Sequence, residues 1–245
     1  MLLVSMGLSG CTANPWAGDA PYTPTLLSPL RAPNPKSSPV GSGITPVKKR
    51  YSQQSLAYFD QIAFGSEFSN NPHTLRVRKW TRDLRIAVHG QPTPQDFQAL
   101  TQMLGELNAL MAPDGIALTL TETASNVDIY FVPHQSFGRY EPNYVRGNLG
   151  FFYVWWNGRM ELTRSRILIA SDRITQRERN HLLREELTQS LGLMNDAWTY
   201  DNSIFYQGWT RTQTYAEIDR DLIRILYDPR VKAGHNPNQV RQAIR

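Results

Sequence analysis

The sequence predicts an α+β fold in which a mixed, twisted sheet is backed by helices. Helical and β-type segments follow one another without the strict alternation of a parallel α/β chain. The pair Asn157-Gly158 lies between two β-rich runs, and this pair is the strongest short signal for a β-hairpin. Segments before and after that hairpin carry apolar residues at helical spacing, so the sheet has helices to pack against.

The first residues have the pattern of a secretion signal. Residues 1–10 are apolar and too few to span a bilayer, which takes about 20 apolar residues. They end in Leu8-Ser9-Gly10-Cys11, which resembles the lipobox of bacterial lipoproteins. That resemblance implies cleavage before Cys11, acylation of this residue and a lipid anchor. The following Thr12 favours the outer membrane, so we expect a lipid-anchored protein of the bacterial cell envelope, facing the periplasm.

The rest of the chain divides into a tether and one domain. Residues 12–49 are rich in Pro, Ser, Gly, Ala and Thr, which cannot build a core. If extended, this tether reaches on the order of 100 Å. Residues 50–245 hold the periodic patterns and form the expected domain. The net charge of +5 favours anionic partners, but no long basic run occurs, so we expect no nucleic-acid binding.

The elements of this domain follow from periodicity and from turn residues. Thr93 is expected to cap a helix that has Pro94 at its first position. Residues 133–148 are expected to form a long loop. The expected helices are 52–64, 94–111, 181–191 and 215–227, and the expected strands are 84–89, 116–121, 127–132, 149–156 and 159–170.

The helix at 181–191 carries two stripes at four-residue spacing. Since each residue turns the helix by about 100°, the stripes lie on roughly opposite sides. One side is expected to enter the core and the other to present polar groups. Gly192 ends the helix in a left-handed conformation, and Asn195 and Asp196 are placed to fold back toward the polar side. The apolar stripe is Leu183, Leu187 and Leu191, and the polar stripe is His181, Glu185 and Gln189.

This layout resembles the site helix of metzincin-type zinc metallopeptidases. The resemblance places Glu185 at the first histidine ligand, Glu186 at the catalytic glutamate and Gln189 at the second histidine. It places Gly192 at the turn glycine and Asn195 at the third histidine. None of the three ligand positions holds histidine. The resemblance therefore implies a zincin-like fold with a degenerate metal motif.

Two later segments extend the resemblance. Residues 200–206 resemble the metzincin segment that carries the Met-turn, with Phe205 in the methionine place and Tyr206 after it. These two residues are the implied floor of the site. The helix at 215–227 resembles the closing helix, which implies a smaller C-terminal helical subdomain.

The chain from about residue 53 onward also resembles a proteobacterial, lipoprotein-associated domain family of unknown function. The residues that carry this resemblance lie at 62–68, 184–196 and 226–229.

The ligand positions suit zinc poorly. Catalytic zinc takes mainly histidine and carboxylate ligands, whereas Gln189 and Asn195 offer neutral amide oxygens, which suit calcium better. His181 and Asp196 are the possible substitute ligands. The competing interpretation is that His181 and Glu185 form an ordinary pair on the helix surface.

Two hypotheses follow. In the first, the domain is a non-catalytic, metallopeptidase-like binding or scaffolding module without a cofactor. Its partner would be an envelope protein or an extended peptide, which the aromatic strand at 151–156 could bind by strand addition. A strand buried on both sides explains those aromatic residues equally well. In the second, the domain is a metal-dependent peptidase or hydrolase that uses zinc or calcium and Glu186 as general base.

Overall fold

A computed structural model of the protein describes residues 51–64, 75–142, 144 and 147–245. The predicted signal sequence with Cys11 and the predicted tether at 12–49 lie outside these residues. No helix in the described part of the chain is long and apolar enough to cross a membrane.

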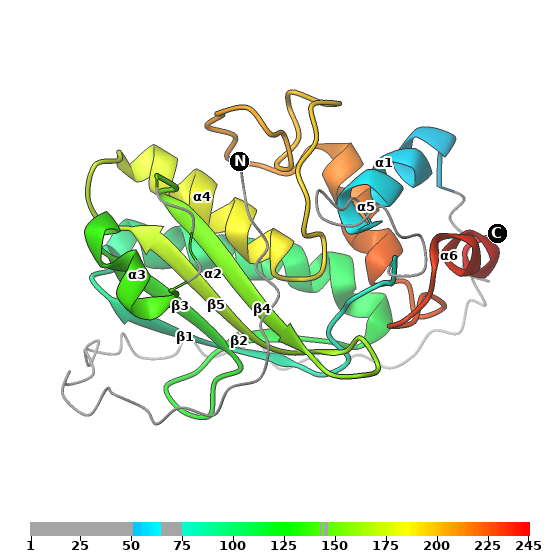
Figure 1. The fold of residues 1–245 in the computed structure, drawn as a ribbon, viewed down its shortest axis with the longest axis horizontal. Coiled ribbons are helices and arrows are strands. Elements are labelled where there is room, and N and C mark those ends of the chain that lie inside the picture. The colour runs from blue at the N-terminus through cyan, green and yellow to red at the C-terminus, as the bar shows by residue number, and fades with distance from the viewer. Residues whose placement is uncertain (1–50, 65–74, 143, 145–146) are drawn as a thin grey trace, which may run out of the picture.

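The described residues form an α+β fold with a mixed five-stranded sheet, as predicted (Figure 1). The strand order is β2-β1-β3-β5-β4, and only β4 runs antiparallel to its neighbour. The predicted hairpin at Asn157-Gly158 joins β4 to β5 and places β4 at the edge of the sheet. The strands are β1 (Leu84–Gly90), β2 (Leu118–Leu120), β3 (Val127–Val132), β4 (Gly150–Trp156) and β5 (Leu162–Ala170).

Two long helices, α2 (Pro94–Met111) and α4 (Gln176–Gln189), pack against each other, and α4 contacts β4 and β5. Thr93 caps α2 as predicted, and its hydroxyl accepts from the backbone N–H of Asp96. Helix α4 begins five residues before the predicted start. Thr175 forms a capping box with Glu178, which gives the helix a fixed first turn there.

Three further helices gather at one end of the sheet (Figure 1). They are α1 (Gln53–Phe64), α5 (Glu217–Leu226) and α6 (Pro237–Ala243), and α1 contacts both others. The first helix of the domain thus packs with the two C-terminal helices, and a separate C-terminal subdomain stays a prediction. Helix α6 was not predicted, although Asn236, Pro237 and Gln239 supply a cap, a first-turn proline and a capping box.

The predicted loop at 133–148 contains two short helices, η3 (His134–Ser136) and α3 (Phe137–Tyr140). A further 3-10 turn, η2 (Ala112–Asp114), follows α2. Phe137 packs on the sheet face that α4 does not cover, against Phe151 and Tyr153. The alternate residues Phe152 and Val154 face the main core. Most of β4 is therefore buried on both sides, which was one of the two interpretations of its aromatic residues.

Gly192 ends the turn after α4 with a φ of 119°, which confirms the predicted left-handed position. A Cβ at this residue would lie 2.0 Å from the backbone oxygen of Arg78. The next contacts are the carbonyl carbon of Arg78 at 3.1 Å and the Leu226 side chain at 3.3 Å, so the shortest contact is with backbone, which would have to move.

We therefore expect Gly192→Ala to lower the free energy of unfolding by about 3 kcal/mol, from backbone strain and overpacking together. Gly115→Ala is the matched control, because Gly115 has a φ of 74° but no atom within 4 Å of the added Cβ. Strain alone should cost the control about 1 kcal/mol. Urea unfolding measures both, and equal losses would contradict the role given to the contact with Arg78.

Candidate functional site

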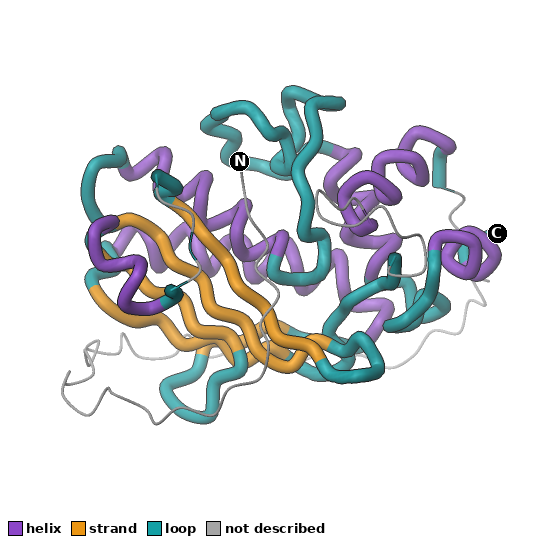
Figure 2. Tube along the Cα trace, viewed as in Figure 1, coloured by secondary structure: helices purple, strands orange, loops and turns teal. Residues whose placement is uncertain are grey.

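The polar stripe of α4 is covered by residues 195–215, which we call the cover segment. This segment leads from the end of α4 to α5 and forms neither a helix nor a strand (Figure 2). His181, Glu185 and Gln189 are all buried beneath it or beside it. The polar groups on this side of α4 therefore face the cover segment and not the solvent, because the chain folds back over them.

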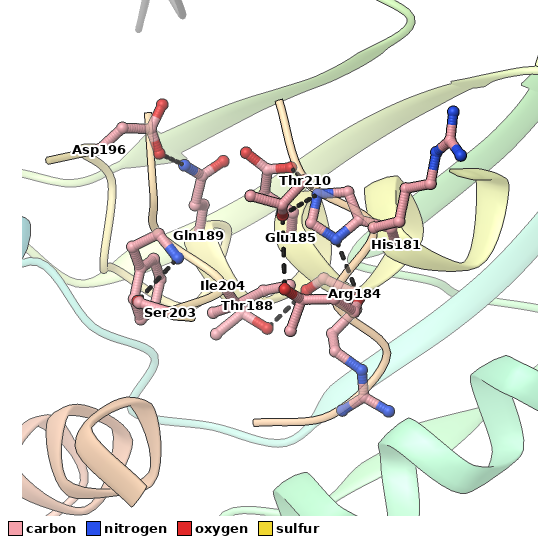
Figure 3. Close-up of polar contacts among 12 residues, drawn as sticks. His181, Arg184, Glu185, Thr188, Gln189, Asp196, Ser203, Ile204 and Thr210 are labelled. Atoms are coloured by element: carbon pink, nitrogen blue, oxygen red, sulfur yellow. Dashed lines mark hydrogen bonds and ion pairs between the residues drawn. The ribbon is translucent and has the colours of Figure 1, made fainter. Parts of the chain in front are cut away.

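His181 is held from two sides (Figure 3). Its Nδ1 donates to the backbone oxygen of Thr212, at 2.9 Å. Its Nε2 lies 3.3 Å from Glu185 Oε2 and 3.3 Å from the hydroxyl of Thr210. The His181–Glu185 pair predicted at this spacing forms, but inside the protein and not on the helix surface. Both ring nitrogens thus have partners within the chain.

The two residues after the turn point in different directions. Asp196 folds back to α4, where its Oδ1 accepts from Gln189 Nε2 at 2.5 Å. Asn195 does not fold back, and this part of the prediction was wrong. Its Nδ2 and backbone N–H both donate to the backbone oxygen of Ile62, at 2.8 and 3.2 Å. Ile62 lies in the last turn of α1, whose carbonyl groups need partners outside the helix.

Glu186 points to the sheet and not to the cover segment. It is 0% exposed, and a Cβ added to Gly150 at the start of β4 would lie 2.6 Å from its Oε1. Among the described residues neither carboxyl oxygen has a hydrogen-bond partner. Burial raises the pKa of Glu186 well above its usual range, and the charges of Glu185 and Asp196 raise it further. The geometry therefore favours an uncharged carboxyl group.

These residues do not fit a zinc ion. The second ligand position, Gln189, donates its amide to Asp196, and the third, Asn195, is turned to α1. His181, the possible substitute, has both nitrogens engaged. Within the described ranges, no three His, Cys, Asp or Glu side chains gather in a way that could hold a metal ion. We derive no catalytic step through such an ion.

The turn at residues 203–205 is fixed by a buried carboxylate on α5. Asp219 Oδ1 accepts from the Ser203 hydroxyl at 2.6 Å, and its Oδ2 accepts from the backbone N–H of Ile204 at 3.1 Å. Tyr58 donates to the Ser203 oxygen at 2.9 Å. The sequence analysis missed this role of Asp219. Its signal was an acidic residue at the third position of a helix, where side chains reach back to free N–H groups.

The two predicted floor residues have different surroundings. Phe205 is fully buried in the main core. Tyr206 is half-buried and lies against Trp198, with ring centroids 5.4 Å apart. Their role as the floor of a site stays a prediction.

The cover segment also carries two exposed tryptophans that the sequence analysis did not single out. Trp198 is 66% exposed and Trp209 is 57% exposed. The third large apolar side chain with high exposure in the described ranges is Leu120, on β2. The available signal was the presence of two tryptophans in a segment without helical or strand periodicity.

Comparison with known proteins agrees with the family resemblance. The family model described as protein of unknown function (DUF2927) matches residues 52–245. Among curated proteins no sequence matches the chain.

Two solved structures of the metallopeptidase myroilysin are remotely similar in fold. The first has 12% sequence identity and a TM-score of 0.36, and the match covers 61% of this chain and 82% of that one. The second has 12% identity and a TM-score of 0.28, and the match covers 76% of this chain and 78% of that one.

Asp219 makes the stability of the domain depend on pH. Burial raises its pKa to about 6, against the hydrogen bonds that lower it. The folded protein therefore holds this proton more tightly than the unfolded chain, whose aspartate pKa is about 3.9. Its contribution to stability is complete below about pH 4 and is lost as the pH rises through about 6.

We expect the difference in unfolding free energy between the wild type and Asp219→Asn to fall as the pH rises from 4 to 7. The fall is at most about 3 kcal/mol, given about 1.4 kcal/mol for each pKa unit. Urea unfolding of both proteins at several pH values measures it. A difference that stays constant or grows with pH would show that burial does not govern this carboxyl group.

Proposed function

The chain belongs to the DUF2927 family, whose function is unknown, so we propose a function from its own geometry: the domain binds a partner and does not hydrolyse it. The observation that carries this proposal is the full burial of the Glu186 carboxyl group. A general base must be unprotonated to accept a proton from water. Full burial without a partner, with a raised pKa, favours the protonated form instead.

The exposed aromatic residues of the cover segment support a binding role. Tryptophan is enriched among the residues that carry most of the energy of protein interfaces. Trp198 and Trp209 both stand out from this one segment. Both side chains are large and mostly exposed, so a partner that covered them would bury a large apolar area. We propose that it contacts an envelope protein or an extended peptide.

The edge of the sheet is a second contact surface in this proposal. Strand β4 lies at the edge, and within the described residues it pairs only with β5. An extended peptide can add to such an edge through backbone hydrogen bonds.

A metal-dependent hydrolase is the second candidate function, and one observation favours it. Both carboxyl oxygens of Glu186 and Oε1 of Gln189 are buried without a hydrogen-bond partner in the described part of the chain. Buried polar atoms normally have a partner, and a bound cation would supply one. In this candidate Glu185 and Gln189 would be ligands, helped by His181 or Asp196.

Metal content and peptide cleavage separate the two candidates. Full-length protein without a histidine tag is equilibrated with zinc and calcium and dialysed, and mass spectrometry measures the metal per chain. Cleavage of an unfolded protein substrate is measured in parallel for the wild type and Glu186→Gln. We expect no stoichiometric metal and no cleavage above that of the variant. A stoichiometric metal that Glu185→Ala loses, with cleavage that Glu186→Gln abolishes, would establish the hydrolase.

We further propose that lipid on Cys11 holds the domain at the outer membrane of a bacterial envelope. The sequence Leu8-Ser9-Gly10-Cys11 supports this proposal. The intact mass of protein extracted from membranes is expected to equal the chain from Cys11 onward plus acyl groups. Cys11→Ala is expected to remove that added mass. An unmodified Cys11 in the membrane-extracted protein would refute the anchor.

A further inference from the structure

A polar pocket of about 430 Å³ lies beside the covered stripe of α4. One wall is Arg177, in the first turn of α4, and the other is the end of the cover segment. The cover segment and the residues that follow it contribute one further arginine and several hydroxyl and amide groups. The lining residues used below are Arg177, Asn202, Arg211, Thr212 and Thr214.

The pocket has the charge of an anion-binding site. Two guanidinium groups line it, and none of its lining residues is acidic. Arg177 is exposed and has no ion-pair partner among the residues that the structure describes. Arg211 contacts Glu178 Oε1 at 3.0 Å, but its side chain is still 58% exposed. Both guanidinium groups can therefore reach a ligand.

Several contacts hold the two walls of the pocket in place, although the two arginine side chains themselves are exposed. Glu178, which orients Arg211, is itself fixed by the capping box with Thr175, whose backbone N–H donates to Glu178 Oε2 at 2.8 Å. The backbone oxygen of Thr212 accepts from His181. The amide of Gln213 donates to the backbone oxygen of Arg177 at 3.0 Å. These contacts join the pocket to the same helix that carries the covered stripe.

The chemistry of the lining selects the kind of ligand. The planar guanidinium group of arginine pairs with carboxylate and phosphate oxygens through two parallel hydrogen bonds. Hydroxyl groups of Thr212 and Thr214 and the amide of Asn202 can complete such a contact. The volume of about 430 Å³ lies within the usual range of small-ligand pockets and can hold an acidic side chain together with part of its neighbours. Trp209, exposed two residues before Arg211, offers an apolar surface for the residue next to it.

We propose that this pocket binds the carboxylate of an acidic peptide segment, with Arg177 and Arg211 as the anchoring residues. The inference rests on the proposed binding function and names the class of partner. The proposal assigns a role to two arginines that lie in no recognisable ligand-binding motif of the sequence.

The test is calorimetric titration of the full-length protein with a blocked hexaglutamate peptide, and with a hexaglutamine peptide as the uncharged probe. We expect binding of hexaglutamate only. Arg177→Gln combined with Arg211→Gln should weaken it at least about tenfold, since hydrogen bonds to charged groups contribute about 1.5–3 kcal/mol each. Arg159→Gln, a matched charge change at a side chain that is 80% exposed on the hairpin, should leave the affinity within about twofold.

Three results would overturn the proposal. These are no binding by the wild type, an equal loss in Arg159→Gln, and unchanged binding in the double variant. Inorganic phosphate that binds more tightly than the peptide and displaces it would also overturn the carboxylate assignment. Arg177→Gln alone serves as a second variant, because Arg177 has no role in capping α4 and its loss should not affect folding. Failure of the proposed binding function would be seen in a different experiment, as metal-dependent cleavage in the peptide-cleavage assay described above.

Discussion

The packing of α4 on β4 places a carboxyl group where the described residues offer it no hydrogen-bond partner. Glu186 is fully buried at this contact, and Gly150 leaves the space that its Oε1 occupies. A buried charge without a partner would cost far more than a neutral group, which costs about 1–3 kcal/mol when unsatisfied. Burial at this contact therefore raises the pKa of the carboxyl group and favours its protonated form. The proposed binding role rests on this constraint.

On the other side of α4 the buried polar side chains do have hydrogen-bond partners. The polar stripe is closed by the cover segment through partners that the chain itself supplies. His181 contacts Thr212 and Glu185, and Gln189 contacts Asp196. The site helix thus has both of its sides inside the protein, and its polar groups stabilise the position of the cover segment. The cover segment exposes Trp198 and Trp209, and its end lines the pocket that also contains Arg177. These are the features on which the proposed binding role rests.

The sequence predicts the parts of this fold that depend on local patterns. The hairpin at Asn157-Gly158, the cap at Thr93 and the left-handed Gly192 all follow from the conformational preferences of single residues. The burial of the polar stripe could not be predicted in this way. Polar residues at four-residue spacing indicate a solvent-facing side, and only the tertiary path of the cover segment reverses that. Asn195 shows the same limit, because its partner Ile62 lies 133 positions earlier in the chain.

The protonation state of Glu186 tests this account most directly. Protein labelled with ¹³C at the glutamate carboxyl carbons can be titrated by NMR, with Glu186→Gln identifying the signal. The account predicts that this carboxyl group is still protonated at neutral pH and shows no titration near the ordinary glutamate pKa of about 4.3. A signal that titrates there would show a charged Glu186 able to accept a proton, and would contradict the proposed binding role that rests on its protonated form.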